Sequence, residues 1–168
     1  MVGEEIKSYG LKSSSLPYYL GAFMSVERER VTVISPFISN FDIPDVTPDF
    51  KLGKDQQSSF FGALCHLSHI GVEIMIYTKK TDLREILEKN GAIAKFTRIK
   101  STNDLHEKFF ITTKFFYKGS ANLTHYGMYE NIEDCAFGLV SENASYLRGT
   151  VHEIDSVSKE VTQRSGTK

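Results

Sequence analysis

Three short apolar runs, separated by helical patterns, constrain the fold of this 168-residue chain more than any other feature. The runs have the length of single strands and cover residues 31–34, 72–77 and 93–99. Apolar residues recur at helical spacing over 60–70, and a second helix is expected to contain 84–87, with Thr81 as its cap. The alternation of strand and helix is typical of an α/β domain in which the strands pair in parallel.

The second half of the chain has a β-rich pattern instead. Two runs with strand-forming residues, 108–112 and 115–118, are separated by a two-residue turn and predict a hairpin. A further strand is expected over 135–140, followed by a last helix over about 144–161. In the first half, Pro17 marks the expected start of a helix that precedes the first strand.

The length indicates one domain, because two domains would each be small for an independent core. Residues 1–16 are polar and contain glycines and a run of serines, so we expect a flexible lead-in before a domain over 17–168. Residues 39–55 are rich in proline and aspartate and are expected to form a long surface loop.

The composition excludes several classes of protein. Hydrophobic residues make up 40% and charged residues 24%, which argues against intrinsic disorder. Cys65 and Cys135 provide neither a disulfide framework nor zinc-site spacing, so we expect a reducing, cytoplasmic compartment. No apolar run approaches the roughly 20 residues that span a bilayer, and no signal-peptide pattern follows Met1, so no membrane association is expected.

The net charge of −1 conceals an uneven distribution. Residues 79–118 hold ten Lys and Arg against five Asp and Glu, whereas the segments on both sides are acidic. A basic stretch in a nearly neutral protein indicates a local anionic partner. A solvated lysine-rich face would give the same pattern, and charge alone does not separate the two.

One short segment carries the residues that point to chemistry. His106 and Lys108 are two positions apart at the start of a strand, so their side chains face the same way. Gly119, Ser120 and Asn122 follow the hairpin, where we expect a helix to begin and to offer its free N–H groups to an anion. Together these groups predict a phosphate pocket, although each alone is commonly structural.

In this order the residues resemble the signature of the phospholipase D superfamily, His-x-Lys, four residues, Asp, and then Gly-Ser-x-Asn. The matching residues are His106, Lys108, Gly119, Ser120 and Asn122. Asn131 and Glu133 stand where single-motif endonucleases of the superfamily have Asn-x-Glu, whereas Thr113 replaces the Asp and the hairpin is one residue shorter. The resemblance implies an α/β sandwich with a mixed, largely parallel sheet flanked by helices and one motif per chain.

The resemblance also implies a phosphohistidine mechanism that needs no metal or other cofactor. His106 would attack the phosphorus while the partner's His106 protonates the leaving oxygen, which places the site on the two-fold axis of a homodimer. Lys108 and Asn122 would stabilise charge on the phosphate oxygens. Glu133 would accept the Nδ1 hydrogen of His106, and Ser120 would support Glu133 or a phosphate oxygen.

We expect a nucleic acid as the substrate, with DNA favoured over RNA by the resemblance alone. Gly119 would allow close approach of the phosphate, and Lys114 and Lys118 would contact the backbone of the nucleic acid. His125 is a further candidate for a substrate contact. A role in restriction or anti-phage defence and an additional protein partner are further expectations.

Two other functions stay open at this point. A lipid phosphodiesterase would share the motif, although no amphipathic anchor is evident. A nucleic-acid-binding subunit of a larger complex could keep the pocket and have lost turnover together with the Asp. His66 and His69 lie three positions apart but lack a third metal ligand, and the doubled phenylalanines of the hairpin are expected to cover both sheet faces rather than to stack on bases.

Overall fold

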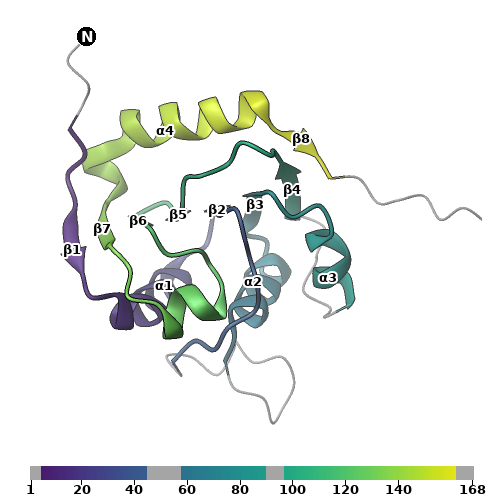
Figure 1. The fold of residues 1–168 in the computed structure, drawn as a ribbon, viewed down its shortest axis with the longest axis horizontal. Helices are drawn as coiled ribbons and strands as arrows, with labels where there is room; N and C mark the ends of the chain where they lie inside the picture. Colours follow the sequence, from purple (N-terminus) through teal and green to yellow (C-terminus); the bar gives the residue numbers. More distant parts are fainter. Residues whose placement is uncertain (1–4, 45–57, 90–96, 162–168) are drawn as a thin grey trace, which may run out of the picture.

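The computed structural model describes residues 5–44, 58–89 and 97–161. Its centre is one eight-stranded sheet with the spatial order β1-β7-β6-β5-β2-β3-β4-β8. Figure 1 shows α4 running along one face of this sheet, while α1 and α2 cover the other. None of the helices in these three ranges has the length and hydrophobicity that a membrane span requires.

The elements follow the expected order. The strands are β1 (Tyr9–Leu11), β2 (Arg30–Ile34), β3 (Glu73–Thr78), β4 (Thr97–Ser101), β5 (Phe109–Ile111), β6 (Phe115–Gly119), β7 (Cys135–Leu139) and β8 (Lys159–Glu160). The helices are α1 (Leu16–Val26), α2 (Phe60–His69), α3 (Leu83–Lys89) and α4 (Val140–Val157). The expected strand over 93–99 is described only from Thr97, because residues 90–96 lie outside the described ranges.

The sheet is mixed, as predicted, but it is not largely parallel. The pairs β2–β3 and β3–β4 are parallel, and the other five pairs of neighbours are antiparallel. The β5–β6 pair is antiparallel because a tight turn joins the two strands, and such a connection reverses the direction of the chain. Parallel pairing is therefore confined to the strands that are separated by helices.

The expected flexible lead-in over 1–16 is wrong for most of its length. Tyr9–Leu11 pairs with β7 in antiparallel register, and Leu16 is fully buried. Without β1, the outer side of β7 would expose unpaired N–H and C=O groups, and pairing with β1 gives these groups hydrogen-bond partners. Lys7 is held as well, because its backbone N–H donates to Asn143 Oδ1 at 2.7 Å. Residues 1–4 lie outside the described ranges.

Some helices begin and end at the residues that the sequence predicts. Ser59 caps α2 by accepting a hydrogen bond from the N–H of Gly62 at 3.0 Å, and Gly71 follows the helix with φ +93°. The last helix spans Val140–Val157, but Asn143 has non-helical φ −132° and ψ 18°. A kink therefore separates a short first turn from the main helix, which starts near 144 as predicted and ends before β8 rather than at 161. At the kink, Asn143 Nδ2 donates to the carbonyls of Leu139 and Lys7, both at 2.9 Å.

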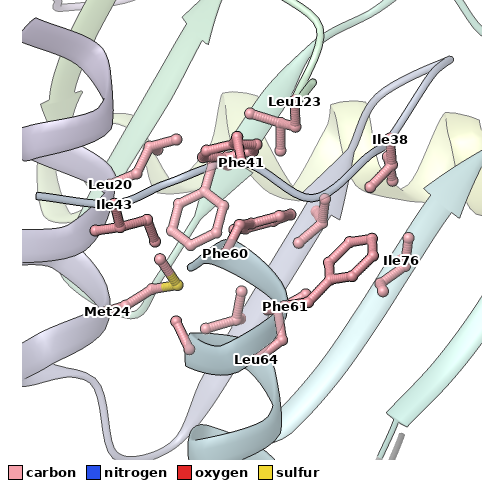
Figure 2. Packing of buried hydrophobic residues seen from close by; sticks show 14 of the residues in the cluster. Leu20, Met24, Ile38, Phe41, Ile43, Phe60, Phe61, Leu64, Ile76 and Leu123 are labelled. Atoms are coloured by element: carbon pink, nitrogen blue, oxygen red, sulfur yellow. The ribbon is translucent and has the colours of Figure 1, made fainter. Parts of the chain in front are cut away.

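Two hydrophobic clusters lie on the two faces of the sheet. Figure 2 shows the larger one, in which Phe41 and Phe60 stack at 4.7 Å between α1 and α2. In the expected surface loop, Phe41 and Ile43 are buried in the core while Asn40 and Asp42 are exposed, and residues 45–55 lie outside the described ranges. The doubled phenylalanines of the hairpin point to both faces and are mostly buried, as predicted, which leaves them unavailable to bases.

Candidate active site at one edge of the sheet

The strand register brings distant parts of the motif to one edge of the sheet. Ile34 at the end of β2 pairs with Phe109 at the start of β5, and Phe109 pairs with Lys118 near the end of β6. Gly119 pairs in turn with Cys135 at the start of β7. The residues before β5, after β6 and before β7 therefore emerge together, and these segments contain His106, Ser120 and Glu133.

His106 and Lys108 lie in the short connection that leads into β5. Leu105 anchors this connection by being buried beneath α4, and the N–H of Gly119 donates to the carbonyl of Lys108 at 3.3 Å. The Lys108 ammonium donates to the carbonyl of His106 at 2.8 Å. The His106 side chain is exposed, and no other described residue forms a hydrogen bond with its imidazole. The backbone is thus fixed while the ring stays accessible.

Ser120 and Glu133 form a small network beside them. The Ser120 hydroxyl donates to Glu133 Oε2 at 2.5 Å and accepts from the N–H of Asp134 at 2.9 Å. Asn131 Nδ2 donates to Glu133 Oε1 at 3.1 Å, so both carboxylate oxygens have a partner. The contact between Ser120 and Glu133 agrees with the expected supporting role. No hydrogen bond joins Glu133 to His106 in the described chain, and that contact stays a prediction.

The backbone around Gly119 and Asn122 is closely packed. A Cβ at Gly119 would come within 2.2 Å of the Asp134 carbonyl oxygen, so glycine is needed here for strand packing. Asn122 lies beside Ser35, whose hydroxyl is 3.4 Å from Asn122 Oδ1 and accepts from the N–H of Leu123 at 3.0 Å. Ser35 was not predicted as a site residue, although a buried serine directly after an apolar strand is a signal for it.

The helix that was expected to begin at Ser120 does not form there. Residues 120–124 are irregular, and only a single π-helical turn, Tyr126–Glu130, follows. The Tyr117 hydroxyl fixes this segment, because it donates to the carbonyl of Ala121 and accepts from its N–H, both at 3.0 Å. The predicted anion site at a helix N-terminus is therefore wrong, and any phosphate contact at Ser120 must use side chains or irregular backbone.

Of the two lysines predicted to contact substrate, Lys118 lies at this edge with its ammonium under α4, whereas Lys114 lies at the opposite end of the hairpin. Lys114 lies in the turn at the other end of the hairpin, about 16 Å away at 3.3 Å per strand residue. The Lys118 ammonium donates to the Tyr146 hydroxyl at 2.8 Å and lies over the rings of Phe109 and Tyr146, beneath α4. His125 stays near the edge, exposed, with Nε2 3.3 Å from Glu130 Oε1.

The position of the missing Asp is also remote from His106. Thr113 lies in the hairpin turn, and its N–H and hydroxyl donate to Glu27 Oε2 at 2.8 and 2.9 Å. Glu27 is only 2% exposed and also accepts from the N–H groups of Arg28, Glu29 and Arg30 at 3.0, 2.8 and 3.1 Å. Burial alone would raise the pKa of Glu27, but the bonds from Thr113 and the following N–H groups outweigh it and lower this pKa.

No cluster of three metal-ligating side chains is found in the described part of the chain. His66 and His69 lie in the last turn of α2, and β3, which follows this helix, begins at the edge opposite His106. The Nε2 of His69 is 3.6 Å from Cys65 Sγ. The structure therefore does not connect these histidines with the edge that holds the motif.

Comparison with known proteins places the fold. No protein-family model matches the sequence, and no curated protein is significantly similar to it. Among solved structures, NucT from Helicobacter pylori has a TM-score of 0.66 at 14% identity over 93% of this chain and 99% of that one. The phospholipase D family member Nuc from Salmonella typhimurium has 0.63 at 13% over 92% and 98%.

A third structure is that of TrmBL2, an archaeal chromatin protein with a novel mode of DNA binding. It has a TM-score of 0.60 at 10% identity, and the match covers 94% of this chain but 56% of that one. The chain thus has the α/β fold of phospholipase D-like proteins, with a mixed sheet flanked by helices. At these identities the likeness establishes the fold alone.

Proposed function

We propose that this chain hydrolyses phosphodiester bonds of nucleic acid through a covalent phosphohistidine. DNA is the favoured substrate. One observation carries the proposal. An accessible imidazole at His106 lies at the same sheet edge as the Lys108 ammonium and the Ser120–Glu133 pair, in a fold shared with a phospholipase D family member. An unencumbered imidazole beside a cation suits nucleophilic attack on an anionic diester.

In the proposed reaction, the neutral His106 forms a bond to phosphorus as the bond to the leaving oxygen breaks. The partner's His106 donates the proton that the leaving oxygen needs, and then accepts one from the water that hydrolyses the phosphohistidine. Lys108 and Asn122 stabilise charge on the phosphate oxygens. Glu133, fixed by Ser120, is proposed to orient the imidazole once substrate closes the site.

A groove beneath α4 extends to the edge of the sheet opposite His106, so it does not support a second copy at the motif. The groove has a volume of about 870 Å³ and lies between α4 and the sheet. Its lining carries charges of both signs, including Arg30, Arg148, Glu73 and Asp155. The lining includes Glu73 at the start of β3 and Thr113 in the hairpin turn, so the second copy is proposed only because the reaction needs a second imidazole.

Nicking of supercoiled plasmid in the presence of EDTA tests the reaction. We expect cleavage by the wild-type chain, loss of cleavage in His106→Ala, and a bell-shaped pH profile, because one imidazole must be neutral and its mate charged. If chains pair at random, an equal mixture of His106→Ala and wild type should have about a quarter of the activity of the same total amount of wild type. A cleavage rate that requires magnesium and is unchanged in Lys108→Ala would contradict the mechanism.

The likeness to TrmBL2 favours one second candidate, a nucleic-acid-binding chain without turnover. Binding of DNA without cleavage, unchanged by His106→Ala, would support this alternative. Cytoplasmic location, a role in defence and a further protein partner remain predictions.

A further inference from the structure

Exposed aromatic rings gather beside the candidate site. Five large aromatic side chains are exposed among the described residues, and three of them, Phe37, Tyr126 and Tyr129, lie on segments that adjoin Asn122. Phe37 is 57% and Tyr126 70% exposed. Exposed rings cost free energy in water, and their grouping at one place indicates a contact surface.

Hydrogen bonds hold these rings on two adjacent segments. The segment after β2 pairs with the segment after β6 through a bridge between Ile38 and Leu123. The N–H of Ser39 donates to the carbonyl of Leu123 at 3.1 Å, and the N–H of His125 donates to the Ser39 hydroxyl at 3.2 Å. Phe37 directly precedes Ile38 and Tyr126 follows Leu123 by three residues, so the two residues lie on either side of this bridge along the two segments.

The rings beyond this bridge form a short row. The His125 ring is 6.1 Å from the Tyr126 ring and 5.5 Å from the Tyr129 ring, measured between centroids. The Tyr129 hydroxyl donates to the carbonyl of Asp42, which fixes this turn against the segment after β2. The row is therefore held in place by the fold rather than free to collapse onto the core.

Lysines border the same surface. The N–H of Lys79 donates to the carbonyl of Pro36 at 3.1 Å, which places Lys79 and Lys80 at the end of β3 next to Phe37. Lys108 lies further along the same edge, in the connection that enters β5. Cations interleaved with exposed rings suit a strand whose phosphates and bases are both accessible.

We propose that the chain takes single-stranded nucleic acid, with unpaired bases stacked on Phe37 and Tyr126 and phosphates facing Lys79, Lys80 and Lys108. A duplex hides the faces of its bases inside the helix, whereas a single strand presents them, and ring stacking is tolerant of base identity. The inference rests on the proposed function only for the position of the scissile phosphate. Strand binding is a separate property and is measured separately.

The test measures binding in a His106→Ala background, which prevents turnover. Fluorescence anisotropy compares a labelled mixed-sequence oligonucleotide with its blunt duplex in EDTA. We expect the single strand to bind about tenfold more tightly than the duplex, and Phe37→Ala or Tyr126→Ala to weaken it about tenfold while duplex binding stays unchanged. Phe37→Trp should restore binding, because it restores a stacking surface.

Tyr9→Ala is the matched control. Tyr9 is as exposed as Phe37, at 57%. It lies on β1, which is the outermost strand of the sheet and is four strands away from β2. This variant should bind both oligonucleotides as the parent does. Equal affinity for single strand and duplex, or no effect of Phe37→Ala in a chain whose melting temperature is unchanged, overturns the inference. A change of oligomer mass in Phe37→Ala also overturns it, because the rings would then join chains.

Hydrolysis of bis(p-nitrophenyl) phosphate by the wild-type chain separates this inference from the proposed function. This small diester has no strand to stack, so its turnover tests the reaction alone. If the diester is not hydrolysed but single strands are still preferred through Phe37, the proposed reaction fails and the inference stands. If the diester is hydrolysed without any strand preference, the inference fails and the reaction stands.

Discussion

The two ends of the β5–β6 hairpin differ in burial and in the way their polar groups are bonded. At the turn, the Glu27 carboxylate is buried and accepts bonds from Thr113 and three successive backbone N–H groups. At the open end, the His106 imidazole is exposed and bonded to no other described residue. The same hairpin therefore has a buried, fully hydrogen-bonded carboxylate at one end and, at the other, an exposed imidazole with no described hydrogen-bond partner.

This difference follows from what each group must do. A buried carboxylate without partners would cost several kcal/mol, so a charge at the turn is tolerated only when fully bonded. A nucleophilic ring needs free electron pairs and room to approach phosphorus, so internal bonds would compete with its reaction. We therefore expect changes at the turn to alter stability and changes at the open end to alter turnover.

The largest effect should come from the open end. His106→Ala removes the proposed nucleophile and should lower plasmid cleavage by at least about a thousandfold, with a change in unfolding free energy within about 0.5 kcal/mol. His69→Ala, an exposed histidine at the end of α2, should leave cleavage unchanged. Cleavage assays and urea unfolding check both. A large loss of stability in His106→Ala would show that the open end is structural.

The next largest effect should come from the turn. Glu27→Ala leaves several buried N–H groups without an acceptor and should lower the unfolding free energy by about 3 kcal/mol. Glu27→Gln keeps one oxygen acceptor and should cost less. Urea unfolding gives the free energies, and cleavage per folded molecule at low temperature should match the wild type. Loss of cleavage in a fully folded Glu27→Gln chain would break the comparison.

A third change introduces at the turn the residue that the superfamily signature has there. Thr113→Asp sets a second carboxylate beside Glu27 and should destabilise the chain by about 2 kcal/mol at neutral pH, without raising turnover. Thr113→Ser keeps the hydroxyl donor and serves as the control. In a Glu27→Gln background the penalty for Asp should largely disappear, which a double-mutant cycle measures. An increase in turnover would instead link this position to the reaction.

The smallest predicted effect is a loss of stability at acidic pH. Because the pKa of Glu27 in the folded chain is below its ordinary value, its contribution to stability is complete above that ordinary value and is lost as pH falls through the folded pKa. Wild type should therefore lose stability more steeply than Glu27→Gln between about pH 5 and pH 3. Urea midpoints across this range check it, and parallel curves would show that the carboxylate has no such role.

Much of the fold could be predicted because its signals are local. The apolar runs at β2 and β3 and the hairpin over 108–118 are visible in short windows, and the structure has strands there. The motif segments could be found for the same reason. What could not be predicted depended on distant partners, since β1 pairs with β7, and the Lys118 ammonium donates a hydrogen bond to the Tyr146 hydroxyl of α4.

The amino-acid sequence by itself determined which segments become strands and which residue types are available for phosphate chemistry, because periodicity and side-chain chemistry are properties of neighbours in the chain. Only the tertiary structure decided that Thr113 meets Glu27, which is 86 positions away, and that Phe37 and Tyr126 flank the same edge. Such contacts arise from strand register and from the need to satisfy buried polar groups, and these depend on the whole sheet.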